Sequence, residues 1–227
     1  MTTAVEKQSP GHGVTPAILL SMTGVTGIVD AVSFLALGHV FTANMTGNVV
    51  FLGFALAGTP GLSLFRSFLA LLSFLGGAFL GGRIPAAQAA RAFAIEAILL
   101  FTAAVIALRV VAPYQVIEAA TYGVIATTGA AMGLRNAMVR KLAIPDLTTT
   151  VLTLTITGLA ADSFSPGADN SRWRRRCASV AVMLAGAAAG ALLLRGSAAP
   201  ALGTAAAITT ASALVTHSIH RKRAREQ

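Results

Sequence analysis

Long apolar runs constrain this chain more than any other feature. Residues 178–194 contain no charged side chain, and residues 62–82 contain only Arg66, close to the start of the run. A run of about 20 apolar residues is long enough to cross a hydrocarbon core of roughly 30 Å as a helix. With 55% hydrophobic and only 11% charged residues and a mean hydropathy of +0.74, the chain is too apolar for a soluble globule. The sequence therefore predicts an all-α, polytopic membrane protein.

Two of the apolar segments are unusually short and rich in polar side chains. If every segment crossed the membrane, the 17 lysines and arginines would divide 11 against 6 between its two sides. If the two short segments enter and return, the division becomes 14 against 3, which fits the positive-inside rule better. The sequence thus predicts six spanning helices, two short re-entrant or half-helix segments and cytoplasmic termini. The segments lie near 17–37, 41–57 (short), 62–82, 92–111, 116–138, 147–161 (short), 178–194 and 198–218.

This topology predicts an internal repeat. Three crossings in each half is an odd number, so the second half enters the membrane from the opposite face. We expect residues 14–112 and 113–217 to form an inverted-topology repeat within one membrane domain. Residues 1–13 and 218–227 are expected to be cytoplasmic tails.

Glycine pairs occur at equivalent positions of the two halves. Gly77 with Gly81 and Gly186 with Gly190 are GxxxG pairs in the third long segment of each half. Small residues let helix backbones approach closely in lipid, so these pairs predict helix contacts. The sequence leaves open whether the contacts lie within the chain or between two copies, and a homodimer is one expectation.

A polar motif also occurs twice. Residues 27–32 lead into the hydroxyl and amide side chains of 41–48, and residues 133–138 lead into those of 148–155. Such residues on short membrane segments predict a solute site at the midplane, although threonines also bond to carbonyls of their own helix. The predicted substrate-binding residues are Thr42, Asn44, Thr46, Gly47, Asn48, Thr149, Thr150, Thr153 and Thr155.

The two short segments carry helix-start signals. A half-helix that begins near Thr42 would direct its free N–H groups toward the bilayer centre, and Gly47 permits a bend or a close approach by a ligand. The second segment opens with Pro145 and Asp146, which are both common at helix starts. Helix N-termini that converge in this way favour an anionic ligand, although Asp30 could equally recruit a cation.

Charged residues inside the apolar segments are the second group of candidates. Asp30 is costly in a membrane helix, and Asn136, next to Arg135, occupies the equivalent position of the second half. Either Asp30 forms a structural contact with Arg135 or Asn136, or these residues serve in coupling or gating. Glu96 is expected to extend toward the cytoplasmic surface or to pair with Arg91.

Other residue types indicate no further chemistry. Arg172–Arg176 and residues 221–225 are basic clusters expected to fix orientation and contact anionic headgroups, and nucleic-acid binding is not expected. Cys177 is the single cysteine, which excludes an intrachain disulfide, and the four histidines lack metal-ligand spacing. No catalytic motif is present. We therefore expect no enzyme activity, no cofactor and no metal.

The first copy of the motif resembles a known family. Residues 26–35, with Asp30-Ala31, and residues 37–48, with Thr46-Gly47-Asn48, resemble the signature of the YoaK-like family of bacterial inner-membrane proteins, a domain of unknown function. The resemblance covers essentially the whole chain and implies a multi-pass protein of the inner membrane. It implies no substrate. The second copy departs from the pattern, since 152–155 read Leu-Thr-Leu-Thr without a glycine.

The function that these features favour is transport or channelling of a small polar or anionic solute through a site between the two halves. A membrane scaffold or sensor without flux is an alternative, and a membrane enzyme is a weaker one because few titratable groups lie near the polar segments. The expected partners are the solute and the lipid bilayer.

Overall fold

A computed structural model describes residues 13–108, 110–111, 115–116, 118–144, 147–150, 152–162 and 170–226. The fold is all-α, and one short antiparallel pair, β1 with β2, joins α4 to α5. The elements are α1 (Pro16–Ala36), α2 (Met45–Leu56), α3 (Leu64–Gly81), the 3-10 turn η1 (Ala86–Gln88), α4 (Ala89–Ala107), β1 (Val110–Val111), β2 (Gln115–Val116), α5 (Glu118–Leu142), α6 (Thr153–Asp162), α7 (Asn170–Leu193) and α8 (Ala198–Arg225).

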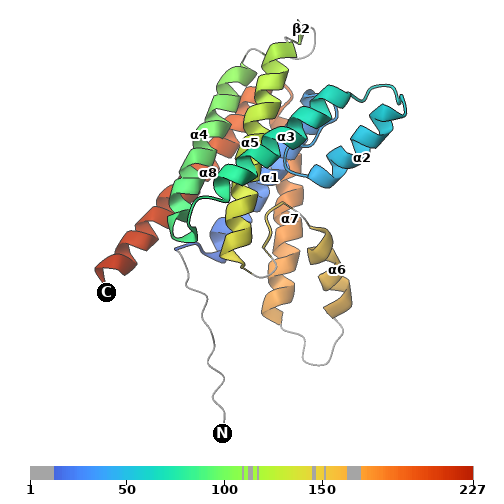
Figure 1. The fold of residues 1–227 in the computed structure, drawn as a ribbon. Helices are drawn as coiled ribbons and strands as arrows, with labels where there is room; N and C mark the ends of the chain where they lie inside the picture. The colour runs from blue at the N-terminus through green and yellow to red at the C-terminus, as the bar shows by residue number, and fades with distance from the viewer. Residues whose placement is uncertain are drawn as a thin grey trace.

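The long helices form one bundle in which helices from the two halves of the chain pack against each other (Figure 1). The third helix of each half packs against the first helix of the other half, α3 against α5 and α7 against α1. The fourth helices, α4 and α8, pack together. Gly13, the first described residue, lies beside the last third of α8, because a Cβ atom on it would lie 3.0 Å from the carbonyl oxygen of Thr216.

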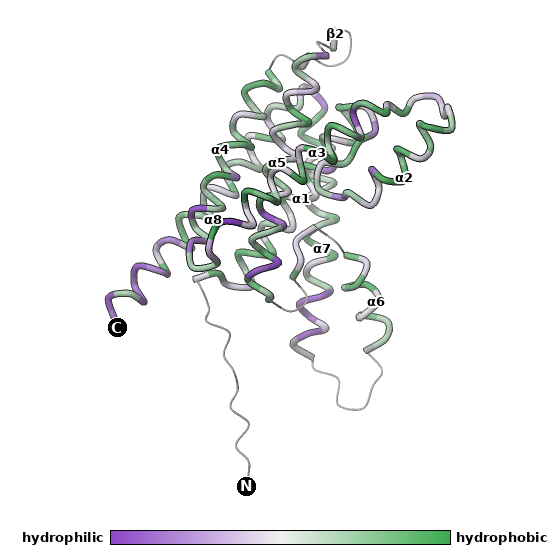
Figure 2. The backbone as a smooth tube through the Cα atoms, viewed as in Figure 1, coloured by the Kyte–Doolittle hydropathy of each residue, from purple (hydrophilic) through white to green (hydrophobic). Residues whose placement is uncertain are grey.

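Among the described residues, five helices are long and apolar enough to cross a membrane: α1, α3, α4 with η1, α7 and α8. The sequence predicts six, and the remaining long helix is α5. It has 25 residues, or about 37 Å at 1.5 Å per residue, but its glycines, threonines and Arg135 lower its hydropathy. Hydrophilic residues gather at one end of the bundle, where α5 and α8 end and α7 begins (Figure 2). The chain is a polytopic, all-α membrane protein.

The two short helices lie beside the bundle at different heights. α2 packs against α3, and α6 packs against α7. In Figure 1, both short helices begin at mid-height of the bundle. From there α2 runs toward the end that holds β2, and α6 runs toward the opposite end. With 12 and 10 residues, neither is long enough to span a bilayer alone.

The GxxxG pairs form contacts within the chain. A Cβ atom on Gly77 would collide with the carbonyl oxygen of Ala130 in α5, and one on Gly81 would lie 2.5 Å from that of Leu134. The glycines of the second half repeat this arrangement on α1, since Gly186 faces Gly24 and Gly190 faces Ile28. Gly24 precedes Ala130 by the same number of residues as Ile28 precedes Leu134. The α3–α5 and α7–α1 interfaces therefore correspond position by position.

Candidate functional site

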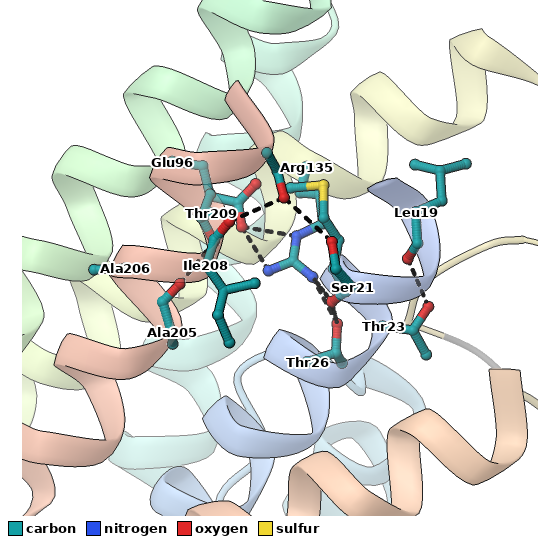
Figure 3. A network of polar contacts seen from close by, with 12 residues as sticks. Leu19, Ser21, Thr23, Thr26, Glu96, Arg135, Ala205, Ala206, Ile208 and Thr209 are labelled. Carbon is teal, nitrogen blue, oxygen red and sulfur yellow. Dashed lines mark hydrogen bonds and ion pairs between the residues drawn. The ribbon is translucent and has the colours of Figure 1, made fainter. Parts of the chain in front are cut away.

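A fully buried ion pair lies at the centre of the bundle. Nε of Arg135, on α5, donates to Oε1 of Glu96, on α4, at 2.8 Å, and Nη2 lies 2.5 Å from the same oxygen (Figure 3). Both side chains have no exposed surface. Removing two charges from solvent costs several kcal/mol per ion before pairing, so a buried ion pair is weak evidence for a purely stabilising role.

The same guanidinium also contacts α1. Nη1 of Arg135 donates to the carbonyl oxygen of Met22 at 2.5 Å and to Oγ1 of Thr26 at 2.8 Å. One side chain thus joins α1 and α4 of the first half to α5 of the second. Oε2 of Glu96 has no hydrogen-bond partner among the described residues. A buried acceptor in this state is free to bind a proton, water or a solute group.

These contacts correct one prediction. Glu96 is expected to extend toward the surface or to pair with Arg91, but it is buried, and Arg91 donates to Oε1 of Gln88 at 3.3 Å instead. Residues five apart do not share a helix face, which explains why Arg91 and Glu96 do not meet. Of the two alternatives for Asp30, a direct hydrogen bond or ion pair with Arg135 or Asn136 is not among the described contacts, although the charges of Asp30 and Arg135 attract each other. Asn136 is half-buried.

Asp30 binds the loop that precedes α2. Its Oδ1 accepts a hydrogen bond from the backbone N–H of Ala43 at 3.1 Å, and the backbone N–H of Thr42 also bonds to this carboxylate. Asp30 lies four residues after Thr26, on the same face of α1. Two polar side chains of α1 therefore lie between the ion pair and α2: Thr26 contacts Arg135, and Asp30 contacts the loop that precedes α2.

Asn48 fixes the same loop from the other side. Its Oδ1 accepts from the backbone N–H of Phe41 at 2.9 Å, and its Nδ2 donates to the carbonyl oxygen of Phe41. The Phe41 ring stacks on both Phe34 and Phe51, and these two rings also contact each other. Asn48 is fully buried, and both ends of its amide bond the chain itself. Asn48 was predicted to bind substrate, but its position in this structure is that of a residue that holds the loop in place.

The start of α2 has unfilled hydrogen-bonding groups. Thr42 is fully buried, and its Oγ1 has no partner among the described residues. Asn44 occupies the N-cap position without a side-chain hydrogen bond to the helix, whereas Thr15, Ser63 and Ser197 cap α1, α3 and α8. The first N–H groups of α2 therefore have no side-chain cap.

Two other predicted residues lie in the first turn of α2. Thr46 is exposed. A Cβ atom on Gly47 would lie 2.7 Å from the Phe41 ring, so this glycine permits close packing of the loop. The helix begins at Met45, three residues later than predicted, after a loop in which Gly38 and His39 adopt positive φ.

The second polar segment is arranged differently. Thr149 is buried and has a φ of 61°, which a continuing helix does not allow, and α6 begins only at Thr153 instead of near 147. The Oγ1 of Thr149 has no described partner, while Oγ1 of Thr150 donates to the carbonyl oxygen of Thr148 at 3.4 Å. Thr155 is buried and Thr153 is exposed. Pro145 and Asp146, the predicted helix-start residues, lie outside the described residues.

Each half places an arginine close to its polar segment, against the preceding loop in the first half and against α6 in the second, which the sequence did not predict. Arg66, on α3, lies over Gly38, where an added Cβ atom would collide with its Nη1. Arg176, on α7, lies over Gly158 of α6, where a Cβ atom would be 2.6 Å from its Cζ. Arg176 is only 7% exposed, although it belongs to a cluster interpreted as a surface anchor. Their positions in apolar or basic stretches offered no signal of this contact.

Comparison with known proteins places the chain in a family. A family model described as "Protein of unknown function (DUF1275)" matches residues 18–215. The chain is 36% identical over 154 residues to the UPF0700 transmembrane protein YoaK of Bacillus subtilis (strain 168), an alignment that covers 63% of this chain and 65% of that protein. The alignment thus spans slightly less than two thirds of this curated relative. No solved structure matches. The chain belongs to the DUF1275 family of transmembrane proteins, as the resemblance in its first polar motif predicts.

Proposed function

We propose that this protein is a transporter or channel for a small polar or anionic solute, with its site between the two halves. The observation that carries this proposal is the start of α2, beside the bundle at mid-height (Figure 1). There, helix N–H groups without a side-chain cap come three residues after Thr42, whose buried hydroxyl has no partner among the described residues. Buried polar groups are normally satisfied, so unfilled ones beside a half-helix mark a place for a ligand or for water.

The proposal includes an inverted repeat. The corresponding glycine contacts of α3 on α5 and α7 on α1 support it, because a duplicated unit related by a twofold axis makes every such contact twice. The opposite directions of α2 and α6 away from the middle of the bundle support it as well (Figure 1). In this arrangement Thr149, buried and unpartnered, is the counterpart of the Thr42 region.

Charge favours an anionic group on the solute. Arg66 lies against the loop that leads into the first polar segment, Arg176 lies against α6 in the second, and helix N-termini carry partial positive charge. The acidic residue next to the first segment, Asp30, already accepts backbone hydrogen bonds from the loop. We assign Thr42, Thr149, Thr150 and Thr155 to the solute, with Asn44, Thr46 and Thr153 nearer the openings.

The ion pair of Glu96 and Arg135 is suited to coupling. It links helices of both halves, and Glu96 retains a free oxygen. A solute anion that competes for Arg135, or a proton that neutralises Glu96, would release α1 from α5 and let the halves move. Asp30, one turn along α1, would transmit that movement to the loop before α2.

We also propose the bacterial inner membrane as the location, with both termini in the cytoplasm. The hydrophilic ends of α5, α7 and α8 gather at one end of the bundle (Figure 2), where Gly13, the first described residue, lies beside α8. Most of those hydrophilic residues are lysines and arginines, which accumulate on the cytoplasmic side.

The test is a matched pair of threonine variants. Thr42→Val removes a buried hydroxyl that has no partner, and Thr209→Val removes a buried hydroxyl that donates to the carbonyl oxygen of Ala205 at 2.9 Å. Purified protein is first screened by thermal unfolding against small carboxylates and inorganic oxyanions, since binding to the native state raises stability. Uptake of the best ligand is then measured in proteoliposomes.

We expect Thr42→Val to weaken ligand binding about tenfold and to reduce uptake, while Thr209→Val leaves both unchanged. Equal effects of the two variants would contradict the assignment of the site. Absence of any ligand shift and of any flux in well-folded protein would favour the scaffold or sensor instead.

A further inference from the structure

The seam between α4 and α8 holds two cavities. One has a volume of about 560 Å³ and is lined mostly by apolar side chains, among them Ala97, Phe101 and Ala206. The other has a volume of about 200 Å³ and is lined by polar and basic side chains, including Arg91 and His217. The larger cavity is lined by these two helices alone, and the smaller one by both helices together with η1. Early residues of α4 pair with late residues of α8, so the cavities follow one another along one seam.

The larger cavity has the shape and surface of an acyl-chain groove. Its α4 lining runs from Ala94 to Ala104, about 15 Å of helix. Buried alanines such as Ala97 and Ala206 form its floor. Ile98 and Phe101, which are 65% and 62% exposed, stand at its sides and cover part of whatever lies between them.

The smaller cavity provides positive charge at the end of this groove. Arg91 is exposed, and its described contact is the hydrogen bond to Gln88. His217 and His220 face it from α8, and α8 continues with Arg221 and Lys222. Among the described residues, no acidic side chain lines the cavity. Its charge therefore complements a phosphate group.

We propose that this seam is a binding site for an anionic phospholipid, with an acyl chain along α4 and α8 and the phosphate at Arg91, His217 and His220. Basic pockets between membrane helices recognise anionic headgroups, and the adjoining apolar groove accounts for the lipid tail. A second copy fits less well. Two copies share one orientation in the membrane, so a dimer through this seam would bring two basic ends together.

The test uses native mass spectrometry of the full chain with phosphatidylglycerol, which is anionic, and phosphatidylcholine, which is zwitterionic. Arg91→Gln removes the charge at the groove end. Its control, Arg83→Gln, removes an exposed arginine that lies over the Phe79 ring instead. Ala207→Phe fills the groove, and Ala211→Phe places the same bulk one turn further along α8, at an exposed alanine that does not line the groove.

We expect wild-type protein to retain phosphatidylglycerol in preference to phosphatidylcholine. Arg91→Gln should weaken phosphatidylglycerol binding about fivefold, and Ala207→Phe should weaken retention of both lipids, whereas the two controls behave as wild type. Equal retention of the two lipids by wild-type protein would overturn the proposal. So would a lipid-free dimer that Ala207→Phe dissociates, since the seam would then be an interface between copies.

Discussion

The side chain of Arg135 makes four polar contacts to three residues of two other helices, and each of these residues lies far away in the sequence. At the residue scale this is the most consequential arrangement in the molecule. Its partner Glu96 is fully buried, so loss of either residue leaves an uncompensated charge in an apolar core. Breaking such a pair costs about 3–5 kcal/mol, while replacing both partners by apolar residues is often tolerated.

We predict that Glu96→Leu strongly lowers the thermal stability of the detergent-solubilised protein, by about 3–5 kcal/mol, because Arg135 keeps its buried charge. Glu96→Leu combined with Arg135→Leu should recover most of that loss. Arg83→Leu is the control, since Arg83 is exposed and lies outside both proposed sites. Thermal unfolding of the four proteins decides, and an unchanged midpoint in Glu96→Leu would contradict the buried pair.

We also predict that two asparagines of the first polar segment respond differently to substitution. Asn48→Ala leaves the backbone N–H and carbonyl groups of Phe41 unpaired, at about 1–3 kcal/mol for each buried group. Asn44→Ala removes a side chain that makes no capping bond. The midpoints of thermal unfolding compare the two variants. A larger drop in the midpoint for Asn44→Ala than for Asn48→Ala would show that Asn48 does not hold the loop.

At the scale of elements, glycine positions decide which helices meet. Gly77 and Gly186 lie against the backbones of α5 and α1, so any side chain there would force the helices apart. Gly76, one residue before Gly77, has open space where its side chain would be. The helices of the two halves are thus joined through small residues on one face only.

This asymmetry gives a prediction for neighbouring glycines. Gly77→Leu should separate α3 from α5 and leave little folded protein, because the added side chain collides with the Ala130 backbone. Gly76→Leu should fold normally, and Gly186→Leu should behave like Gly77→Leu. Yield and monodispersity by size-exclusion chromatography report the result. Normal folding of Gly77→Leu would exclude this packing.

At the scale of the whole molecule, the two short helices decide the topology. If α2 and α6 do not cross the membrane, the loops around Thr59 and Gly196 lie on one side and the loop around Ala87 lies on the other. If both short helices crossed, Thr59 and Ala87 would exchange sides while Gly196 would stay. Thr59 and Ala87 therefore distinguish the two topologies, and Gly196 is a reference that does not change sides.

We predict the first pattern in intact bacteria. Single cysteines are placed at Thr59, Ala87 and Gly196 in a Cys177→Ser background, since Cys177 is the single native cysteine. An impermeant maleimide should label Thr59→Cys and Gly196→Cys from outside, and Ala87→Cys only after the membrane is opened. Outside labelling of Ala87→Cys would refute the re-entrant arrangement.

Parts of the candidate site followed from the sequence and parts did not. Asp30 and Arg135 were identified because charged residues stand out in apolar helices, and the short segments because they are polar and brief. The partner of Arg135 was not, since Glu96 lies near a basic loop and its burial depends on how α4 packs against α5. The contacts of Arg66 and Arg176 depend in the same way on tertiary packing: a loop lies against Arg66 of α3, and α6 lies against Arg176 of α7.

The sequence by itself determined that this chain is a membrane protein of long helices with two short polar interruptions. Hydropathy and helix length are local properties, and the bilayer imposes the rest. Only the tertiary structure decided that the glycine pairs join the two halves within one chain, that Asn48 holds a loop, and that Glu96 neutralises Arg135. Each of these depends on contacts between residues far apart in the sequence, which close packing selects and periodicity does not encode.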